Sequence, residues 1–268
     1  MSLKAKDYKS GIKPIWCPGC GHYGVLNAIT KAMAARELDT HNTAIISGIG
    51  CSSRLPAYVS SYGFHGVHGR SLPLATGLKV ARPDLEVVAV GGDGDGFSIG
   101  GNHFLHACRR NVDIVYIAMD NEVYGMTKGQ ASPTSPETWL SGKLTPHGTE
   151  NRPFQPCAIA LASGAGFIAR GYSGDPNGLA QLIFEGLAFP GFAFIHVLSQ
   201  CVTFVPEQTA WKQQVHSLDD IPSTAAEAAA LIHADDGFSK GILFRSPRPV
   251  FPREHASTTA DPRQAFAV

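Results

Sequence analysis

Residues 85–130 decide the fold and read LEVVAVGGDGDGFSIGGNHFLHACRRNVDIVYIAMDNEVYGMTKGQ. A short valine-rich run, residues 85–90, is followed by the glycine-aspartate repeat GGDGDG, which is typical of a buried parallel strand that ends in a carboxylate. A helical pattern covers residues 97–110, and a second apolar run covers residues 114–119. The stretch therefore predicts a strand, a helix and a second strand.

Asp93 and Asn121 follow the two predicted strands, so we expect both side chains at one edge of a sheet. A helix of about 14 residues rises roughly 21 Å and a strand of about six residues covers roughly 20 Å, so the chain returns to the edge that it left. Open α/β sheets bind ligands at this edge. A carboxylate and an amide oxygen beside glycines suit Mg²⁺, which also holds phosphate oxygens. The pattern therefore predicts a Mg²⁺ site that anchors a diphosphate.

A dinucleotide-binding loop is the main alternative for this glycine-rich turn. Gly92, Gly94 and Gly96 alternate, but position 97 is Phe where the G-x-G-x-x-G fingerprint has glycine. The second apolar run ends in Asp120-Asn121, and position 121 is Asn rather than the acidic residue that would bind a ribose. An ordinary βαβ unit with a glycine-rich turn is the alternative without a ligand.

Composition limits the class of protein. The chain has 268 residues, of which 44% are hydrophobic and 16% charged, with 29 glycines, as in globular α/β enzymes of one large or two small domains. Lys plus Arg equals Asp plus Glu at 22 each, which gives no reason to expect nucleic-acid binding. No apolar run approaches the roughly 20 residues of a membrane-spanning helix, and the N-terminus lacks the apolar core of a secretory signal. We therefore expect a cytoplasmic protein that binds neither nucleic acid nor membrane.

Six cysteines are too few for a disulfide scaffold, so metal binding, catalysis or burial should explain them. Cys17 and Cys20 form a CxxC motif in a Pro-Gly turn, and Cys51 and Cys201 each stand alone after an apolar run. A redox motif, half of a zinc site and half of an iron-sulfur site all remain open for the CxxC motif. A zinc site would require a second such pair or a His pair, which does not follow. The 2+1+1 arrangement of the four cysteines is compatible with one four-iron four-sulfur (4Fe-4S) cluster.

The rest of the chain predicts a sheet covered on both faces. Helices are predicted at residues 25–36, 73–82, 158–163, 177–188 and 223–233, and strands at residues 43–46, 167–171 and 192–198. Residues 130–156 form a long loop, which is usually functional or covered by a partner. Cys108 and Cys157 are expected to be buried as small apolar side chains. We expect an α/β fold with a mostly parallel sheet, in which residues 1–208 form the ligand-binding domain and residues 209–268 add a helix and an extended C-terminal arm.

These motifs together resemble the β subunit of the 2-oxoacid:ferredoxin oxidoreductases, which bind thiamine diphosphate. The GDG motif and the sequence NEVYGMTKGQ at residues 121–130 carry the resemblance, which extends over about residues 15–201. It implies the thiamine-diphosphate-binding fold, with Mg²⁺ held by the side chains of Asp93 and Asn121 and by the backbone carbonyl of Val123. Asp95 completes a second, overlapping GDG motif, but the spacing to Asn121 favours Asp93 as the ligand.

The resemblance also implies where the other cofactor contacts lie. In that family the WCPGCG and GIGC motifs and a late cysteine hold a 4Fe-4S cluster, and Cys17, Cys20, Cys51 and Cys201 match these positions. Residues 132–135, SPTS, resemble a segment close to the cofactor. The residues expected around thiamine diphosphate are His22, Cys51, His68, Gly92, Asp93, Gly94, Asp95, Asn121, Val123, Tyr124, Gly125, Met126 and Thr127.

Three residues are expected to act on the substrate. His68 stands in an HGR element that lies near the cofactor in that family, and a purely structural hydrogen bond is the alternative. A 2-oxoacid has a carboxylate beside its ketone, and binding it requires fixed cations or good donors. We hypothesise that Arg54 and Lys128 hold such carboxylates, with solvated loop charges as the alternative.

The resemblance implies the β subunit of an enzyme that converts a 2-oxoacid and coenzyme A reversibly into acyl-CoA and CO₂, with electrons passing through the cluster to ferredoxin. The family's activating glutamate comes from another domain, so an α subunit is the expected partner, in a heterodimer or an α2β2 assembly. The GIGCSSR and YGMTKGQ sequences indicate 2-oxoglutarate as the substrate and succinyl-CoA as the product. The alternatives are a pyruvate or broad-specificity 2-oxoacid enzyme, a non-redox thiamine diphosphate decarboxylase or synthase, and a metal-binding structural subunit.

Overall fold

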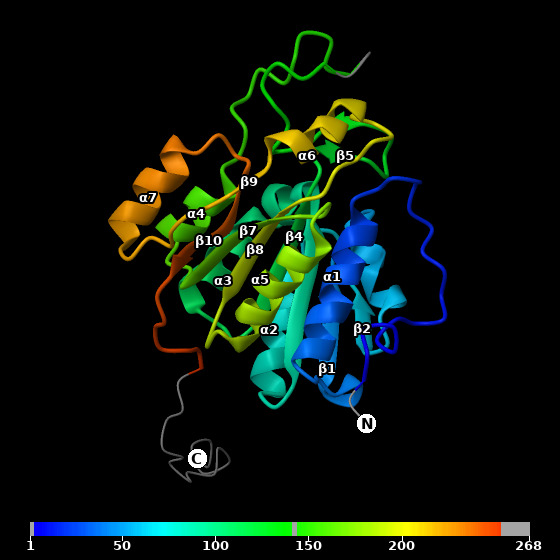
Figure 1. Ribbon diagram of the computed structural model, residues 1–268, viewed down its shortest axis with the longest axis vertical. Coiled ribbons are helices and arrows are strands. Elements are labelled where there is room, and N and C mark those ends of the chain that lie inside the picture. The colour runs from blue at the N-terminus through cyan, green and yellow to red at the C-terminus, as the bar shows by residue number, and fades with distance from the viewer. Residues whose placement is uncertain (1–2, 141–143, 253–268) are drawn as a thin grey trace, which may run out of the picture.

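The computed structural model describes residues 3–140 and 144–252, and within them eight strands form one sheet in the order β2-β1-β3-β4-β8-β7-β10-β9 (Figure 1). Their bounds are β1 Thr43–Ser47, β2 Tyr62–His65, β3 Glu86–Gly92, β4 Val115–Asp120, β7 Phe167–Tyr172, β8 Ala193–Leu198, β9 His216–Ser217 and β10 Ser239–Arg245. All neighbours from β2 to β7 are parallel, and β10 pairs antiparallel with β7. The predicted mostly parallel sheet is confirmed.

Helices cover both faces of the sheet (Figure 1). Their bounds are α1 His22–Ala35, α2 Ser71–Ala81, α3 Gly101–Arg110, α4 Pro156–Ala162, α5 Pro176–Ala188, α6 Trp211–Gln214 and α7 Ala225–Ala234. Helices α1 and α5 pack on one face, and α2, α3, α4 and α7 pack on the other. Within the described ranges, no helix combines the length and the apolarity that crossing a bilayer requires.

The central strands are apolar on both sides because each side faces a helical layer. In β3, Val88 and Val90 belong to the core under α1 and α5, whereas Val87 and Ala89 belong to the core under α2 and α3. This alternation follows from the two-residue period of a strand. It explains why the sequence shows four consecutive apolar residues at 87–90 rather than alternating polarity.

The connection between β3 and α3 is tighter than predicted. A π-helical turn, Gly94–Ile99, begins directly after Asp93 and leads into α3, whereas the sequence pattern predicted one helix from residue 97. A Cβ atom at Gly96 would lie 1.9 Å from the hydroxyl oxygen of Tyr116, so only glycine fits there. This close approach folds the chain back at the strand end and keeps both aspartates at the sheet edge.

Several elements were missed by the sequence analysis. Strand β2 is absent from the predicted strands, and it is exposed at the sheet edge. A short hairpin, β5 Val123–Tyr124 and β6 Gln130–Ala131, lies where loop was expected. Strand β10 buries Leu243 and joins the same sheet, so residues 209–252 add more than a helix and an arm. The remainder of the expected arm, residues 253–268, lies outside the described residues.

Candidate functional site

A cavity of about 270 Å³ opens at the carboxyl ends of β1, β3 and β4. Its wall contains all thirteen residues that were expected around thiamine diphosphate. The lining residues are His22, Ile49, Gly50, Cys51, Ser52, His68, Gly92, Asp93, Gly94, Asp95, Met119, Asn121, Val123, Tyr124, Gly125, Met126 and Thr127. This is the edge of an open α/β sheet at which ligands bind.

Asp93 is a buried carboxylate beside a second one, Asp120. The hydroxyl of Thr134 lies 2.7 Å from Asp120 Oδ1 and 3.2 Å from Asp93 Oδ2, so it joins the two groups. Burial and the neighbouring charge of Asp120 raise the pKa of Asp93 to about 7. Two buried carboxylates held this close are stabilised by a bound cation, and oxygen ligands suit Mg²⁺.

Asp95 has a different role from Asp93. Its Oδ1 accepts hydrogen bonds from Ile49 N at 3.0 Å, Gly69 N at 2.7 Å and His68 Nδ1 at 2.8 Å. These donors come from the loops after β1 and after β2, so Asp95 ties both loops to the end of β3. Asp95 Oδ1 is thus occupied by protein donors, whereas Asp95 Oδ2 is buried and has no hydrogen-bond partner among the described residues.

The two candidate histidines occupy different environments. Asp95 fixes the ring of His68, whose side chain is 38% exposed on the cavity wall and lies 6.4 Å from the ring of Tyr124. His22 is buried, and its Nδ1 lies 2.8 Å from Ser199 Oγ. Burial lowers the pKa of His22 to about 4, so its ring is neutral near pH 7.

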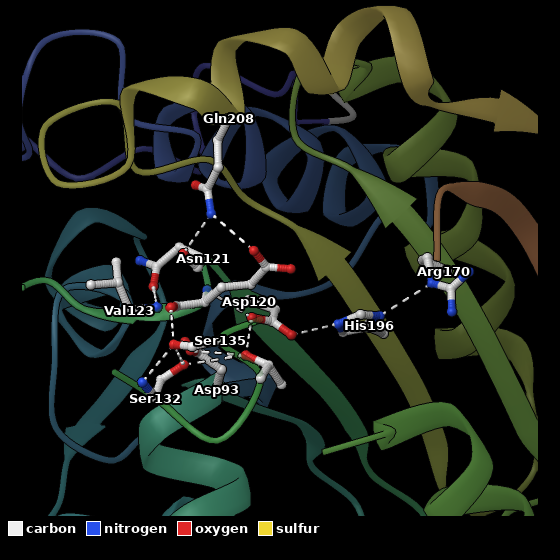
Figure 2. Close-up of polar contacts among 11 residues, drawn as sticks. Asp93, Asp120, Asn121, Val123, Ser132, Ser135, Arg170, His196 and Gln208 are labelled. Carbon is white, nitrogen blue, oxygen red and sulfur yellow. Dashed lines mark hydrogen bonds and ion pairs between the residues drawn. The ribbon is translucent and has the colours of Figure 1, made fainter. Parts of the chain in front are cut away.

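The loop that carries Asn121 is held by hydrogen bonds from several directions (Figure 2). Val123 N donates to Asn121 Oδ1 at 3.2 Å, and Ser135 Oγ donates to the carbonyl of Glu122. Glu122 has a left-handed backbone, with φ of 57°, and burial together with the charge of Asp120 raises its pKa to about 8. The segment expected near the cofactor, residues 132–135, therefore supports this loop through Ser135 and Thr134.

A buried polar chain leads away from Asp120 (Figure 2). His196 Nε2 lies 2.8 Å from Asp120 Oδ2, Arg170 Nε donates to His196 Nδ1 at 3.3 Å, and Arg170 pairs with Asp235. The sequence analysis missed this chain. The sequence nevertheless contains a clue to this chain of side chains, because Arg170 and His196 interrupt otherwise apolar strands.

The four candidate cysteines converge on a second cavity, of about 100 Å³. Cys17, Cys20, Cys51 and Cys201 all line it, and all four are free thiols. Burial, together with the charges of the other three cysteines, raises the pKa of Cys20 to about 12, and burial also raises the pKa of Cys51 and of Cys201. The predicted convergence of these four positions is therefore present in the fold.

The spacing of the thiols does not suit a single zinc ion. Tetrahedral zinc with Zn–S bonds of 2.3 Å would bring the sulfur atoms to about 3.8 Å from one another. Within the described residues, no three of the four sulfur atoms all lie within 4.8 Å of one another. His216, Asp235 and Asp236, which lie elsewhere, do form a group with ligand atoms within this distance. The four sulfur atoms therefore surround a space wider than one tetrahedral ion occupies.

Four residues line both cavities: His22, Cys51, Asn121 and Gly125. A Cβ atom at Gly125 would lie 3.8 Å from the sulfur atoms of both Cys51 and Cys201. The two cavities are therefore separated by a wall one residue thick.

The remaining sequence predictions are resolved as follows. Arg54 is exposed and lines the cysteine cavity, so the structure brings it to the site. Lys128 is also exposed, but it lines neither of the two cavities within the part of the chain described. Cys108 and Cys157 are fully buried outside the site, as predicted.

Comparisons with known proteins give one consistent result. Residues 48–197 match the family model of the thiamine pyrophosphate enzyme C-terminal TPP binding domain. The chain is 44% identical to the 2-oxoglutarate synthase subunit KorB of Methanothermobacter marburgensis, over 93% of this chain and 90% of that protein. It is 46% identical to the 2-oxoglutarate oxidoreductase subunit KorB of Mycobacterium tuberculosis, over 75% of this chain and 54% of that protein.

Two further similarities extend over nearly the whole chain. The 2-oxoacid:ferredoxin oxidoreductase 2 subunit beta of Aeropyrum pernix is 39% identical over 91% of this chain and 84% of that protein. The solved structure of 2-oxoglutarate:ferredoxin oxidoreductase from Magnetococcus marinus, with 2-oxoglutarate, coenzyme A and succinyl-CoA bound, superposes with a TM-score of 0.92 at 41% identity. That match covers 99% of this chain and 96% of the other.

Proposed function

The chain belongs to the β subunits of the 2-oxoacid:ferredoxin oxidoreductases of the 2-oxoglutarate type, and from this premise we propose how its two cavities divide the chemistry. The larger cavity holds thiamine diphosphate, the same compound as thiamine pyrophosphate, through Mg²⁺. The cysteine cavity holds a 4Fe-4S cluster. Together with coenzyme A, the subunit takes part in the conversion of 2-oxoglutarate into succinyl-CoA and CO₂, with electrons delivered to ferredoxin.

The observation that carries this proposal is the shared wall between the two cavities. When bound, thiamine diphosphate supplies the carbon nucleophile for decarboxylation, and an iron-sulfur cluster accepts single electrons. Asn121 and Gly125 each line both cavities, so a single layer of residues lies between the two sites. Electrons therefore have a short path between them. A decarboxylase without redox chemistry has no use for four thiols at this position.

In this proposal Mg²⁺ is held by the side chains of Asp93 and Asn121 and by the backbone carbonyl of Val123. The pairing of the buried Asp93 with Asp120 supports a cation at this place. Glycine at position 94 is required by the ring of Tyr124, which a Cβ atom there would meet at 2.1 Å.

The cluster is proposed to bind Cys17, Cys20, Cys51 and Cys201. Their convergence and their wide spacing support this assignment. Thiols must lose their protons to bind a metal, and the positive charge of iron favours the thiolate form that burial alone disfavours here.

We assign the substrate carboxylate to Arg54, which also lines a further cavity of about 370 Å³ that shares Ile49, Gly50 and Met126 with the wall of the cofactor cavity. His68 is assigned to the cofactor cavity, where Asp95 orients it toward a bound ligand. Lys128 was expected to bind a substrate carboxylate on the same grounds as Arg54, but it lines neither cavity. We therefore propose that it contributes less to substrate binding than Arg54.

The relatives are named as subunits, so this chain works in a complex with other subunits. We propose that an α subunit completes the site at the aminopyrimidine end of thiamine diphosphate, and that ferredoxin docks to collect the electrons. A broad 2-oxoacid specificity is the second candidate, because the similar Aeropyrum pernix protein is named for 2-oxoacids in general.

Anaerobic purification of the complex with its α subunit, followed by iron and thiamine diphosphate analysis, tests the cofactor assignment. We expect about four iron atoms and about one thiamine diphosphate per chain. Cys51→Ala should lose the iron, whereas Cys108→Ala, a control at a buried thiol outside the site, should keep it. Wild-type complex without iron, or iron retained in Cys51→Ala, contradicts the assignment.

A further inference from the structure

Gln208 joins the two candidate cofactor sites through its side chain. The residue lies in the 3₁₀ turn Pro206–Ala210 that follows β8, and it is 2% exposed. Its Oε1 accepts a hydrogen bond from Cys201 N at 2.7 Å, and its Nε2 donates to the carbonyl oxygen of Asn121 at 2.8 Å. Figure 2 shows the Gln208 carboxamide facing Asn121. One buried carboxamide therefore connects a proposed cluster ligand to a proposed Mg²⁺ ligand.

The hydrogen bonds of the Gln208 side chain lie where the backbone pairing of strands β4 and β8 ends. Strands β4 and β8 pair as far as Asp120 and Leu198, and Ser199 N makes the next bond, to Asp120 O at 2.8 Å. Beyond that point the chains separate into the loops that carry Asn121 and Cys201. The side chain of Gln208 continues the connection between these loops.

The loop that carries Cys201 is held together by its own backbone hydrogen bonds. Val205 N donates to Cys201 O at 2.9 Å, and Gln208 N donates to Val205 O at 3.1 Å. Cys201 and Gln208 are therefore held together both by the backbone of this loop and by the Gln208 side chain.

The chemistry of the bridge requires glutamine. Cys201 N–H can only donate and the Asn121 carbonyl can only accept, so the orientation of the carboxamide is fixed by its two partners. Glutamate would keep the acceptor but lose the donor, and it would place a second carboxylate near Glu122 Oε2, which lies 3.5 Å from Gln208 Nε2. Methionine would keep the length and lose both hydrogen bonds.

We propose that Gln208 is a positioning residue that couples the cluster site to the thiamine diphosphate site. This inference rests on the proposed function, and it adds a residue that contacts neither cofactor directly. Coupling between two sites is reciprocal, so a filled cluster site should strengthen cofactor binding, and a bound cofactor should alter the surroundings of the cluster.

A double-mutant cycle in the anaerobic complex with the α subunit tests the coupling. Cys17→Ala removes the cluster without changing Cys201 or a residue that lines the cofactor cavity. In the wild type it should weaken Mg²⁺-dependent thiamine diphosphate binding about fivefold or more. In a Gln208→Met background the same change should weaken binding less than about twofold, because the connection is already cut. The dissociation constant is measured by equilibrium titration, without turnover.

Two further variants sharpen this test. Gln213→Met alters an exposed glutamine in the adjacent helix α6, and it should keep the full wild-type response to Cys17→Ala. Gln208→Glu retains an acceptor for Cys201 N–H, so it should keep its iron and still lose the coupling. Addition of Mg²⁺ and thiamine diphosphate should change the electron paramagnetic resonance spectrum of the reduced cluster in the wild type and in Gln213→Met, and leave it unchanged in both Gln208 variants.

The outcomes separate this inference from the proposed function. Equal effects of Cys17→Ala in the wild-type, Gln208→Met and Gln208→Glu backgrounds would overturn the role of Gln208 and leave the cofactor assignment intact. A wild-type complex that binds no iron or no thiamine diphosphate would overturn both.

Discussion

Asp93 and Asp95 lie two positions apart at the end of β3, but their carboxylates serve different purposes. Asp95 accepts three hydrogen bonds at one oxygen and so fixes two loops. Asp93 shares the hydroxyl of Thr134 with Asp120 and has a pKa raised to about 7 by burial and by that neighbouring carboxylate. Two buried carboxylates that share one hydroxyl favour a bound cation, which supports our proposal of Asp93 as the Mg²⁺ ligand.

Asp93→Asn should weaken Mg²⁺-dependent thiamine diphosphate binding by about a hundredfold, because a charged metal ligand is lost. Folding should be preserved, since the change also removes the repulsion between two buried carboxylates. Asp95→Asn should keep the Mg²⁺ dependence but lower the free energy of unfolding by about 1–3 kcal/mol through its lost loop contacts. Calorimetric titration and thermal unfolding measure the two effects. The assignment is wrong if Asp95→Asn, rather than Asp93→Asn, abolishes the Mg²⁺ dependence.

Arg54→Ala should raise the KM for 2-oxoglutarate about tenfold or more, which corresponds to the loss of a hydrogen bond to a charged group. Lys128→Ala is the matched control, because Lys128 is an exposed cation that lines neither cavity. Steady-state kinetics of the complex, with coenzyme A saturating, measure both. A larger effect from Lys128→Ala than from Arg54→Ala would reverse the assignment of the carboxylate contact.

At the scale of elements, the apolar runs and glycine turns were sufficient to predict β3, α3 and β4 to within a few residues. Strand β10 was missed because it contains Gly241 with φ of 145° and a register shift between Ile242 and Phe244, which interrupt its pattern. Strand β2 was missed because an exposed edge strand has no buried face to produce alternating polarity. Local patterns predict elements that bury a continuous face, and they fail where pairing comes from a distant strand.

Asp175, at the start of helix α5, makes a contact with a strand that is distant in the sequence. Asp175 caps its first turn by accepting from Gly178 N at 3.0 Å, and it also pairs with Lys240 of β10. Asp175→Ala should lower the free energy of unfolding by about 1 kcal/mol near pH 7. Lys240→Met, which keeps the cap, should lower it less.

The same aspartate has a predictable pH dependence. The hydrogen bond from Lys240 and the Gly178 N–H hold the pKa of Asp175 below its ordinary value of 3.8. Its stabilising contribution is therefore present above pH 3.8 and is lost as the pH falls through the lower pKa of the folded state. Urea unfolding at several pH values should show the wild type and Asp175→Ala converging at low pH. A constant difference down to the lowest pH would show that the charge of Asp175 contributes nothing.

At the scale of the whole molecule, the site gathers segments that are far apart in the sequence. The CxxC motif precedes α1, Cys51 follows β1 and Cys201 follows β8, and the fold brings all of them beside Asn121. From its motifs, the sequence alone could predict which residues gather at each of the two cavities. It could not predict the shared wall, the buried chain through His196 or the bridge at Gln208, because these depend on which strand ends become neighbours.

The isolated chain should show negligible 2-oxoacid-dependent turnover, because the proposed α subunit completes the thiamine diphosphate site. Mixing the chain anaerobically with that subunit should restore activity in proportion to the complex formed. Assays of acceptor reduction for the chain alone and for the mixture measure this. Activity of the chain alone equal to that of the mixture would show that no second subunit is required.

The most direct test of the account is anaerobic reduction of an electron acceptor by the complex of this chain with its α subunit, in the presence of coenzyme A. The rates with 2-oxoglutarate, pyruvate and 2-oxobutyrate are compared under the same conditions. We predict rapid reduction with 2-oxoglutarate and much slower reduction with the two monocarboxylic substrates. No reduction with any of the three, despite bound iron and thiamine diphosphate, would contradict the account.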